Sequence, residues 1–242
     1  GGIPRLMKLS ADGKMIFVGT HLGMISVWSL AEGKRIKEWQ AHDGAINDML
    51  FSSDQKYLVS AGADSKTVVW SWPASKLVYN LNDNQGEVNL ITASADGKRF
   101  ITASYDNAIR VWSYYDGKRK TVMSGHSFWV NNVSYDSTGS QIVTASNDNT
   151  ARIWTAEGVL KQTLKGHTDW VNTAVFSKDG KYVLTSSNDR TAKLWQVSDG
   201  SELNTFNGHD DWVTSADFSP DGNYILTASP DNTAKIWLRT NG

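Results

Sequence analysis

Histidine, serine and aspartate recur together along this chain, and these are the residue types of a nucleophilic triad. In a triad the histidine takes a proton from the serine while the carboxylate orients the imidazole. The complete sets are His126, Ser146 and Asp148; His167, Ser187 and Asp189; and His209, Ser229 and Asp231. An active site needs one such set, so three copies indicate a structural role and argue against catalysis.

A tryptophan follows each of these aspartates by six residues, and the same tryptophan recurs along the whole chain. The six are Trp28, Trp70, Trp112, Trp154, Trp195 and Trp237, separated by 42, 42, 42, 41 and 42 residues. Two incomplete sets come earlier, namely His42, Gly62 and Asp64, and Asn84, Ser104 and Asp106. Four columns held in register over five copies identify an internal repeat.

Each period contains the signals of short strands and tight turns. Asp-Gly pairs, in which the glycine supplies the positive φ of a hairpin turn, stand at residues 12–13, 96–97, 179–180 and 221–222. Between turns lie β-branched and aromatic runs such as 182–185 and 224–227, and no stretch has a helical period. Each period therefore predicts four antiparallel strands, a to d, with the repeat tryptophan on strand c.

A four-stranded sheet of this length cannot bury both of its faces, so the sheets are expected to stack as the blades of a propeller. The sequence predicts an all-β fold: a β-propeller of six four-stranded antiparallel blades in one domain, residues 1–242. The repeats are expected near 1–40, 41–82, 83–124, 125–165, 166–207 and 208–242. Residue 1 aligns with residue 43 and residue 242 with residue 200, so the last blade is expected to lack its outer strand. The open alternative is a piece of a longer or engineered propeller.

Residues 125–154 and the two copies that follow closely resemble the WD-repeat β-propeller family, and the resemblance covers essentially the whole chain. The aspartate that follows tryptophan in the family name is absent, and Leu22 replaces the repeat aspartate of the first copy. The resemblance implies a hydrogen-bond chain in each blade, from the tryptophan indole through Ser or Thr and His to Asp. The expected structural set is the three complete triplets with Trp154, Trp195 and Trp237. Because Gly62 replaces serine and Asn84 replaces histidine, weaker networks are expected in blades 2 and 3.

Composition excludes several classes of function. Lys and Arg number 24 and Asp and Glu 25, so a net charge of −1 gives no strong field toward nucleic acid or an anionic membrane. The absence of cysteine excludes thiolate catalysis and cysteine-ligated metals. No phosphate loop, nucleotide-binding glycine pattern or metalloprotease motif occurs. We expect no enzyme, cofactor, metal site, nucleic-acid partner or membrane span, and a cytoplasmic location.

Three further tryptophans share one column, three residues after the repeat histidine. They are Trp129, Trp170 and Trp212, and because Ala45 and Glu87 occupy the same column elsewhere, the fold does not demand tryptophan there. The column opens strand a, and the resemblance implies a partner site on the top face of the propeller. The predicted partner-binding set is Trp129, Trp170, Trp212, Tyr105, Asn131, Asn172, Asp169 and Asp211. In the alternative, the three tryptophans pack on neighbouring loops and cap the channel.

The sequence thus predicts a non-catalytic scaffold that binds a protein or peptide on its top face, since tryptophan anchors dominate protein interfaces. The alternative is a structural module that associates through its rim or through the open edge of the last blade. That edge is the strand at residues 233–238, which Ile236 and Trp237 make apolar. Of the remaining candidates, His21 is expected to be exposed, Trp39 to belong to the core, and Trp72 to lie near the outer rim.

Overall fold

A computed structural model describes residues 2–94 and 96–240, and within these ranges the chain is built from strands without a helix. Residues 1 and 242, on which the expectation about the chain ends rests, lie outside the described ranges. The described residues group into two compact units. Unit 1 comprises the residues up to 93 with 97–120, and unit 2 comprises 94, 96 and 121–240. The boundary falls within strand β12 (Arg119–Met123). One domain over the whole chain stays a prediction.

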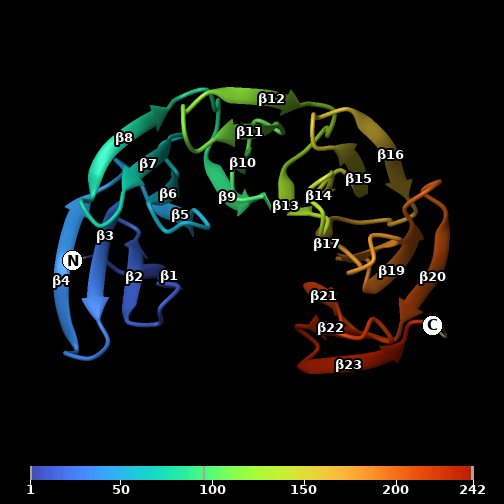
Figure 1. Ribbon diagram of the computed structural model, residues 1–242. Coiled ribbons are helices and arrows are strands. Elements are labelled where there is room, and N and C mark those ends of the chain that lie inside the picture. Colours follow the sequence, from blue (N-terminus) through green and yellow to red (C-terminus); the bar gives the residue numbers. More distant parts are fainter. Residues whose placement is uncertain (1, 95, 241–242) are drawn as a thin grey trace. The chain divides into compact units, whose positions relative to one another are not determined.

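Unit 1 contains the first three sheets apart from residues 121–123 of β12, and we call these sheets blades 1 to 3 (Figure 1). Blade 1 consists of β1 (Pro4–Leu9), β2 (Met15–Thr20), β3 (Met24–Ser29) and β4 (Lys34–Gln40). Blade 2 consists of β5 (Ile46–Phe51), β6 (Tyr57–Gly62), β7 (Thr67–Ser71) and β8 (Lys76–Leu81). Blade 3 consists of β9 (Val88–Ala93), β10 (Arg99–Ser104), β11 (Ile109–Ser113) and β12 (Arg119–Met123).

Unit 2 contains blades 4 to 6. Blade 4 consists of β13 (Val130–Tyr135), β14 (Gln141–Ser146), β15 (Thr150–Thr155) and β16 (Leu160–Lys165). Blade 5 consists of β17 (Val171–Phe176), β18 (Tyr182–Ser187), β19 (Thr191–Gln196) and β20 (Glu202–Asn207). Blade 6 consists of β21 (Ser215–Phe218), β22 (Tyr224–Ser229) and β23 (Thr233–Leu238).

Within each blade the strands pair with their sequence neighbours in antiparallel fashion. The predicted fold class is confirmed: six antiparallel blades, four-stranded except for a three-stranded last blade. The Asp-Gly turns take the expected conformation, with a φ of 67° at Gly13, 70° at Gly180 and 71° at Gly222. Such angles favour glycine, because it has no Cβ to clash with the backbone.

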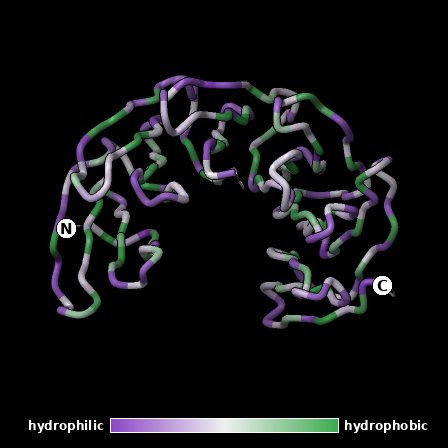
Figure 2. The backbone as a smooth tube through the Cα atoms, viewed as in Figure 1, coloured by the Kyte–Doolittle hydropathy of each residue, from purple (hydrophilic) through white to green (hydrophobic). Residues whose placement is uncertain are grey.

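The hydrophobic core lies between successive blades of each unit. In unit 1, Phe17 and Ile25 of blade 1 pack against Leu58 and Trp70 of blade 2. In unit 2, Trp195 of blade 5 packs against residues of blade 4. Figure 2 shows the corresponding pattern along the tube, short hydrophobic segments that alternate with hydrophilic ones. In blades 2, 3 and 5 the repeat tryptophan is therefore a core residue on strand c that covers the preceding blade, whereas Trp28 of blade 1 is 39% exposed.

Asparagine side chains tie the innermost strands of neighbouring blades together. In unit 2, the Asn131 amide donates to the Val171 carbonyl and the Asn172 amide donates to the Val213 carbonyl, both at 2.9 Å. In unit 1, Asn47 donates to Val88 at 3.1 Å. These bonds satisfy backbone carbonyls at the start of the next strand a, and they hold successive strands in the same register.

Candidate functional site

The repeated polar residues form a buried hydrogen-bond chain, which blade 5 shows most clearly. The His167 imidazole is 1% exposed, with Nδ1 2.6 Å from Asp189 Oδ2 and Nε2 2.7 Å from Thr185 Oγ1. The Trp195 indole donates to the same Thr185 oxygen at 2.8 Å. Because a carboxylate only accepts, Nδ1 carries the proton and Nε2 accepts from the threonine hydroxyl. Both imidazole nitrogens of His167 and the indole nitrogen of Trp195 thus have a hydrogen-bond partner.

Blades 2, 4 and 6 repeat this arrangement. The histidines lie 2.6 to 2.8 Å from both of their partners, and the tryptophans lie 2.9 to 3.0 Å from the shared hydroxyl. The four sets are His42, Ser60, Asp64 and Trp70; His126, Thr144, Asp148 and Trp154; His167, Thr185, Asp189 and Trp195; and His209, Thr227, Asp231 and Trp237. A buried, saturated network offers no reactive group to a substrate, so its role is structural.

The hydroxyl that links histidine to tryptophan is not the serine that the sequence pattern suggested. In blade 5 that serine is Ser187, whose hydroxyl donates to the Asp169 carbonyl at 3.0 Å and accepts from the Asp189 backbone N–H at 3.1 Å. Ser146 makes the same two kinds of bond in blade 4, and Ser229 accepts from the Asp231 N–H in blade 6. These serines therefore shape the turn between strands b and c, and the link lies two residues earlier.

In blade 2 the hydrogen-bond chain is complete, although the turn bonds that the serine makes in blades 4 and 5 are absent. Ser60, at the linking position, lies 2.8 Å from His42 Nε2 and accepts from Trp70 at 3.0 Å, so Gly62 removes no link. A Cβ at Gly62 would collide with the His42 imidazole and the Asp64 carboxylate. In this blade the histidine and the aspartate occupy the space of the missing side chain.

Blade 3 replaces the histidine by an arginine from another strand. Arg110 on β11 donates to the Asp106 carboxylate at 2.7 and 3.1 Å, and it also donates to the Ser104 hydroxyl at 3.2 Å. Asn84 is buried, and its Oδ1 has no hydrogen-bond partner among the described residues. Blade 3 therefore keeps the aspartate at its turn through an ion pair. Sequence reasoning missed this arginine, although it lies only four residues after the aspartate, on the strand that follows the turn.

The carboxylates of these networks are held in the ionised form. Burial alone would raise the pKa of Asp189, but hydrogen bonds from His167, Thr191 and the Thr168 backbone lower it well below the usual range. Burial opposes ionisation at Asp106 too, and bonds from its arginine and serine outweigh it and lower its pKa to about 2. The aspartates of the networks therefore remain charged at neutral pH.

The second candidate site lies on unit 2, where three tryptophan side chains face solvent. Trp129, Trp170 and Trp212 are 40%, 45% and 51% exposed, and each precedes or lies near the start of a strand a. Asp169 accepts a hydrogen bond from the Trp170 backbone N–H at 2.7 Å, and Asp211 accepts one from Trp212 at 2.8 Å. We call these five residues the tryptophan surface. Its members come from equivalent positions of three successive blades.

The other predicted partner-binding residues have different surroundings. The amides of Asn131 and Asn172 are half-buried and are used in the bonds between blades, and they also donate to Asn147 and Asn188. We therefore assign both asparagines to positioning the strands that carry the tryptophans. Tyr105 is exposed but belongs to unit 1, so it is not counted with the tryptophan surface.

The remaining aromatic and histidine candidates lie in unit 1. Trp39 is half-buried and its ring centroid is 5.8 Å from that of Trp70. Trp72 is half-buried against Phe17, with ring centroids 4.7 Å apart. His21 is exposed, as expected, and its Nδ1 accepts from the Ile3 backbone at 2.8 Å. None of the three adds to the tryptophan surface.

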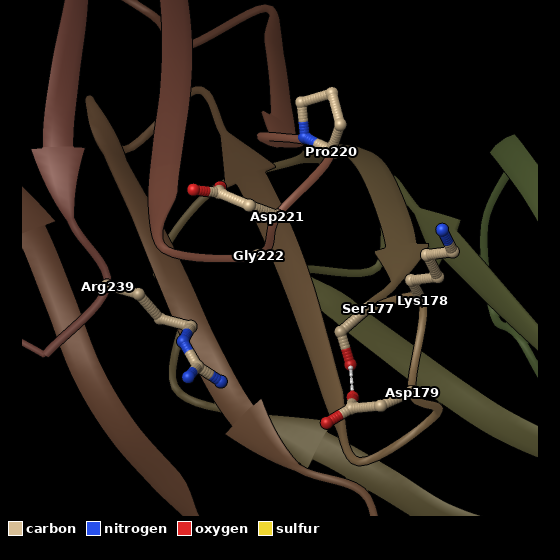
Figure 3. A pocket seen from close by; sticks show the side chains of 7 residues that line it. All are labelled: Ser177, Lys178, Asp179, Pro220, Asp221, Gly222 and Arg239. Atoms are coloured by element: carbon tan, nitrogen blue, oxygen red, sulfur yellow. Dashed lines mark hydrogen bonds between the residues drawn. The ribbon is translucent and has the colours of Figure 1, made fainter.

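A small cavity lies between blades 5 and 6 at the end where strand a turns into strand b. Its volume is about 260 Å³, and its walls include Asp179, Asp221, Lys178 and Arg239 (Figure 3). Ser177 donates to Asp179 across the turn at 2.6 Å. Because carboxylates and cations line it together, the cavity has no net preference for an anion or a cation. Antiparallel strands place it at the opposite end of the blades from the tryptophan surface.

Residues 2–94 and 96–240 were compared with the requirements for a membrane-spanning helix and for a metal site. In these ranges no helix is long and apolar enough to span a membrane. In the same part of the chain, no cluster of three or more His, Asp or Glu side chains could bind a metal ion.

Comparison with known proteins identifies the repeat. The model of the family "WD domain, G-beta repeat" matches five times, at residues 33–71, 75–113, 117–155, 158–196 and 200–237, and so covers more than half of the chain. Each full match runs from strand d of one blade through strand c of the next, so the family's repeat is offset by one strand from the blade.

Curated relatives share short stretches with this chain. It is 38% identical over 60 residues to cilia- and flagella-associated protein 57 of Mus musculus, 24% of this chain and 5% of that protein. It is 33% identical over 66 residues to the WD repeat-containing protein 91 homolog of Dictyostelium discoideum, 27% and 9% of the two chains. It is 36% identical over 61 residues to WD repeat-containing protein 36 of Homo sapiens, 25% and 7%. The chain thus matches under a tenth of each of these relatives.

Proposed function

Because this chain belongs to the WD-repeat family (WD domain, G-beta repeat), we propose that it is a non-catalytic scaffold that binds a protein or peptide through its tryptophan surface. WD-repeat proteins generally act as protein-interaction scaffolds, and the family is generally non-catalytic. The polar sets that resemble a catalytic triad are consumed by structural hydrogen bonds. The binding function therefore has to reside in exposed residues that the fold does not need.

The exposed tryptophans are the observation that carries this proposal. The repeat tryptophan Trp195 is 1% exposed and donates its indole N–H to Thr185, whereas Trp170 of the same blade is 45% exposed. No hydrogen-bond acceptor for the indole nitrogens of Trp170 and Trp212 occurs in the described part of the chain. Exposed tryptophans supply large contact areas and dominate the energetics of interfaces. Because Ala45 and Glu87 occupy the equivalent positions of blades 2 and 3, the fold does not require tryptophan there, and the side chain can serve binding.

The proposal is tested with short random peptides displayed on phage and selected on the immobilised protein. Selected peptides are then synthesised and titrated by fluorescence polarisation against the wild type, Trp170→Ala and Leu203→Ala. Leu203 is a matched control, because it is 49% exposed and lies on β20, the outer strand of the same blade. Trp170→Ala should weaken binding by about 2 kcal/mol, roughly 30-fold, and Leu203→Ala should leave it unchanged. Equal affinities for Trp170→Ala and the wild type would refute the proposal.

A second function, self-association, is favoured by the outer face of blade 6. Leu226 and Ile236 are 50% and 73% exposed, whereas their counterparts Leu184 and Leu194 in blade 5 are buried by blade 6. A hollow of about 520 Å³ lies on this face, lined by apolar side chains that include Tyr224. An exposed apolar face of this kind is typical of an interface. We propose that a second copy of the chain covers it.

Sedimentation velocity over a range of concentrations tests self-association. The wild type should form dimers or larger species as its concentration rises, and Ile236→Lys should remain monomeric because association would bury an unpaired charge. Trp170→Ala is the control and should associate like the wild type. A wild type that stays monomeric at every concentration would rule out this function.

A further inference from the structure

The end of unit 2 that carries the tryptophan surface is strongly acidic. The loops that lead into β17 and β21 contain Asp169, Asp210 and Asp211 and no lysine or arginine. The turns between strands b and c lie at the same end, because the Asn188 N–H of one such turn donates to the Trp170 carbonyl at 2.9 Å. These turns add Asp148, Asp189 and Asp231, with Arg190 as their one cation. The side chains of these three are buried in the hydrogen-bond chains, and Lys235 donates to the Gly208 carbonyl in the loop before β21. The carboxylates that can meet a ligand at this end are therefore Asp169, Asp210 and Asp211.

The carboxylates of the loops are free to meet a partner. One oxygen of Asp169 and one of Asp211 accept the backbone N–H of the following tryptophan. None of Asp169, Asp210 and Asp211 forms an ion pair with a described lysine or arginine. Asp210 is exposed, and the other two are half-buried beside the rings. The backbone bonds fix the carboxylates of Asp169 and Asp211 in position, and no ion pair compensates their charge.

The charge of the whole chain conceals this asymmetry. Unit 1 has 15 Lys and Arg against 11 Asp and Glu, a net charge of +4, whereas unit 2 has 9 against 14, a net charge of −5. The two values sum to the −1 of the chain. A cationic ligand is therefore attracted to unit 2, and an anionic ligand such as a phosphate backbone is repelled.

We propose that the tryptophan surface binds a peptide segment through its lysine or arginine side chains, which lie against the indole rings beside Asp169 and Asp211. Tryptophan is the aromatic ring that attracts a cation most strongly, because its face carries the negative part of the ring quadrupole. The carboxylates supply the charge that pairs with the cation at the edge of each ring. This inference rests on the proposed peptide-binding function and specifies the chemistry of the partner.

The test uses the displayed peptides, selected on the wild type and counter-selected on Trp170→Ala. Peptides that depend on Trp170 should be enriched in Lys and Arg over the starting library by at least about twofold and depleted in Asp and Glu. Synthetic versions with every Lys and Arg replaced by Gln should bind at least about tenfold more weakly. The affinity should fall with added salt, but far less than for a ligand held by many phosphate contacts.

Protein variants test the carboxylates directly. In D169N/D211N the asparagine oxygens can still accept the tryptophan N–H groups, so the loops keep their bonds while two charges are lost. This variant should bind the cationic peptides about fivefold more weakly. Asp199→Asn is the matched control, because Asp199 is an exposed aspartate of unit 2 that also accepts a backbone N–H, from Ser201 at 2.9 Å, at the opposite end of blade 5. It should bind like the wild type.

The outcomes separate this inference from the function on which it rests. If Trp170-dependent peptides are neutral or acidic, the partner chemistry is wrong and peptide binding stands. If no peptide depends on Trp170, the proposed function itself fails. Equal losses for D169N/D211N and for Asp199→Asn would trace the effect to the net charge of the unit and overturn the local role of the carboxylates.

Discussion

Replacing His167 by alanine should destabilise the protein by about 2–3 kcal/mol. The bond to the charged Asp189 carboxylate contributes about 1.5–3 kcal/mol and the neutral bond to Thr185 about 0.5–1.5 kcal/mol. The loss is expected below the sum, because Asp189 keeps the backbone N–H of Thr168 and the hydroxyl of Thr191 as donors. Thr185 likewise keeps the indole N–H of Trp195. The assay is urea unfolding followed by tryptophan fluorescence and circular dichroism, with the two probes compared for coincidence.

The control for this prediction is His21→Ala in blade 1. His21 is exposed and makes its 2.8 Å bond to the Ile3 backbone at the surface, where water can replace it. This change should cost less than about 0.5 kcal/mol. If His167→Ala and His21→Ala shift the urea midpoint equally, the buried hydrogen-bond chain does not stabilise the fold as the geometry indicates, and the reasoning is refuted.

Three further predictions concern unit 1. Asp106 has a pKa of about 2 in the folded chain against an ordinary 3.8, so its stabilising contribution is complete above about pH 5 and disappears as the pH falls toward 2. The stability difference between the wild type and D106N, measured by urea titration across this range, should shrink accordingly; a difference independent of pH would contradict it. Gly62→Ser restores the serine found in the other repeats, but it should lower the urea midpoint because its Cβ would collide with the His42 ring. A higher midpoint would show that the ring moves aside freely. Gly23→Ala places a Cβ against the His42 backbone oxygen at a φ of 77°, so it should lower the free energy of unfolding in urea by at least about 3 kcal/mol. Gly13→Ala, which has open space around it, should lower that free energy by about 1 kcal/mol. Equal losses would disprove the close contact.

The strands and the register of the repeat tryptophans were predictable from the sequence because repetition adds weak signals together. One Asp-Gly pair is a weak indication of a turn, but four at equivalent positions with a tryptophan every 41 or 42 residues define the blade. The predicted strand at residues 182–185 falls inside β18, and the tryptophan of that blade lies on β19 as expected. Polar and apolar alternation then decides which side of each strand is buried.

The linking hydroxyl was assigned to the wrong column because of the same alternation. Thr185 and Ser187 are two residues apart on β18, so both point to the same side of the strand, and spacing alone does not separate them. One signal could have done so. The position ten residues before the repeat tryptophan holds a hydroxyl in all five later blades, at Ser60, Thr102, Thr144, Thr185 and Thr227, whereas the serine column is interrupted by Gly62. Because every network needs the linking hydroxyl, the column that holds a hydroxyl in every blade is the better candidate for it.

Two other features were not predicted from the sequence. Arg110 lies four residues after Asp106, on the strand that follows its turn, and this short spacing is a signal that could have paired the two. Asn131 and Asn172 are used between blades, a contact 40 or 41 residues along the chain. The charge asymmetry was likewise invisible, because it appears only when the chain is divided into its two units.

The packing of one blade on the next predicts the order in which the blades of unit 2 unfold. Within unit 2, blade 5 is covered on one face by blade 4 and on the other by blade 6, whereas Leu226 and Ile236 of blade 6 are exposed. In an array with nearest-neighbour coupling, such a terminal element opens first, and each step uncovers the face of its neighbour. Backbone amides of β21–β23 should therefore exchange with deuterium earlier than those of β17–β19, although the two sheets carry nearly the same polar network.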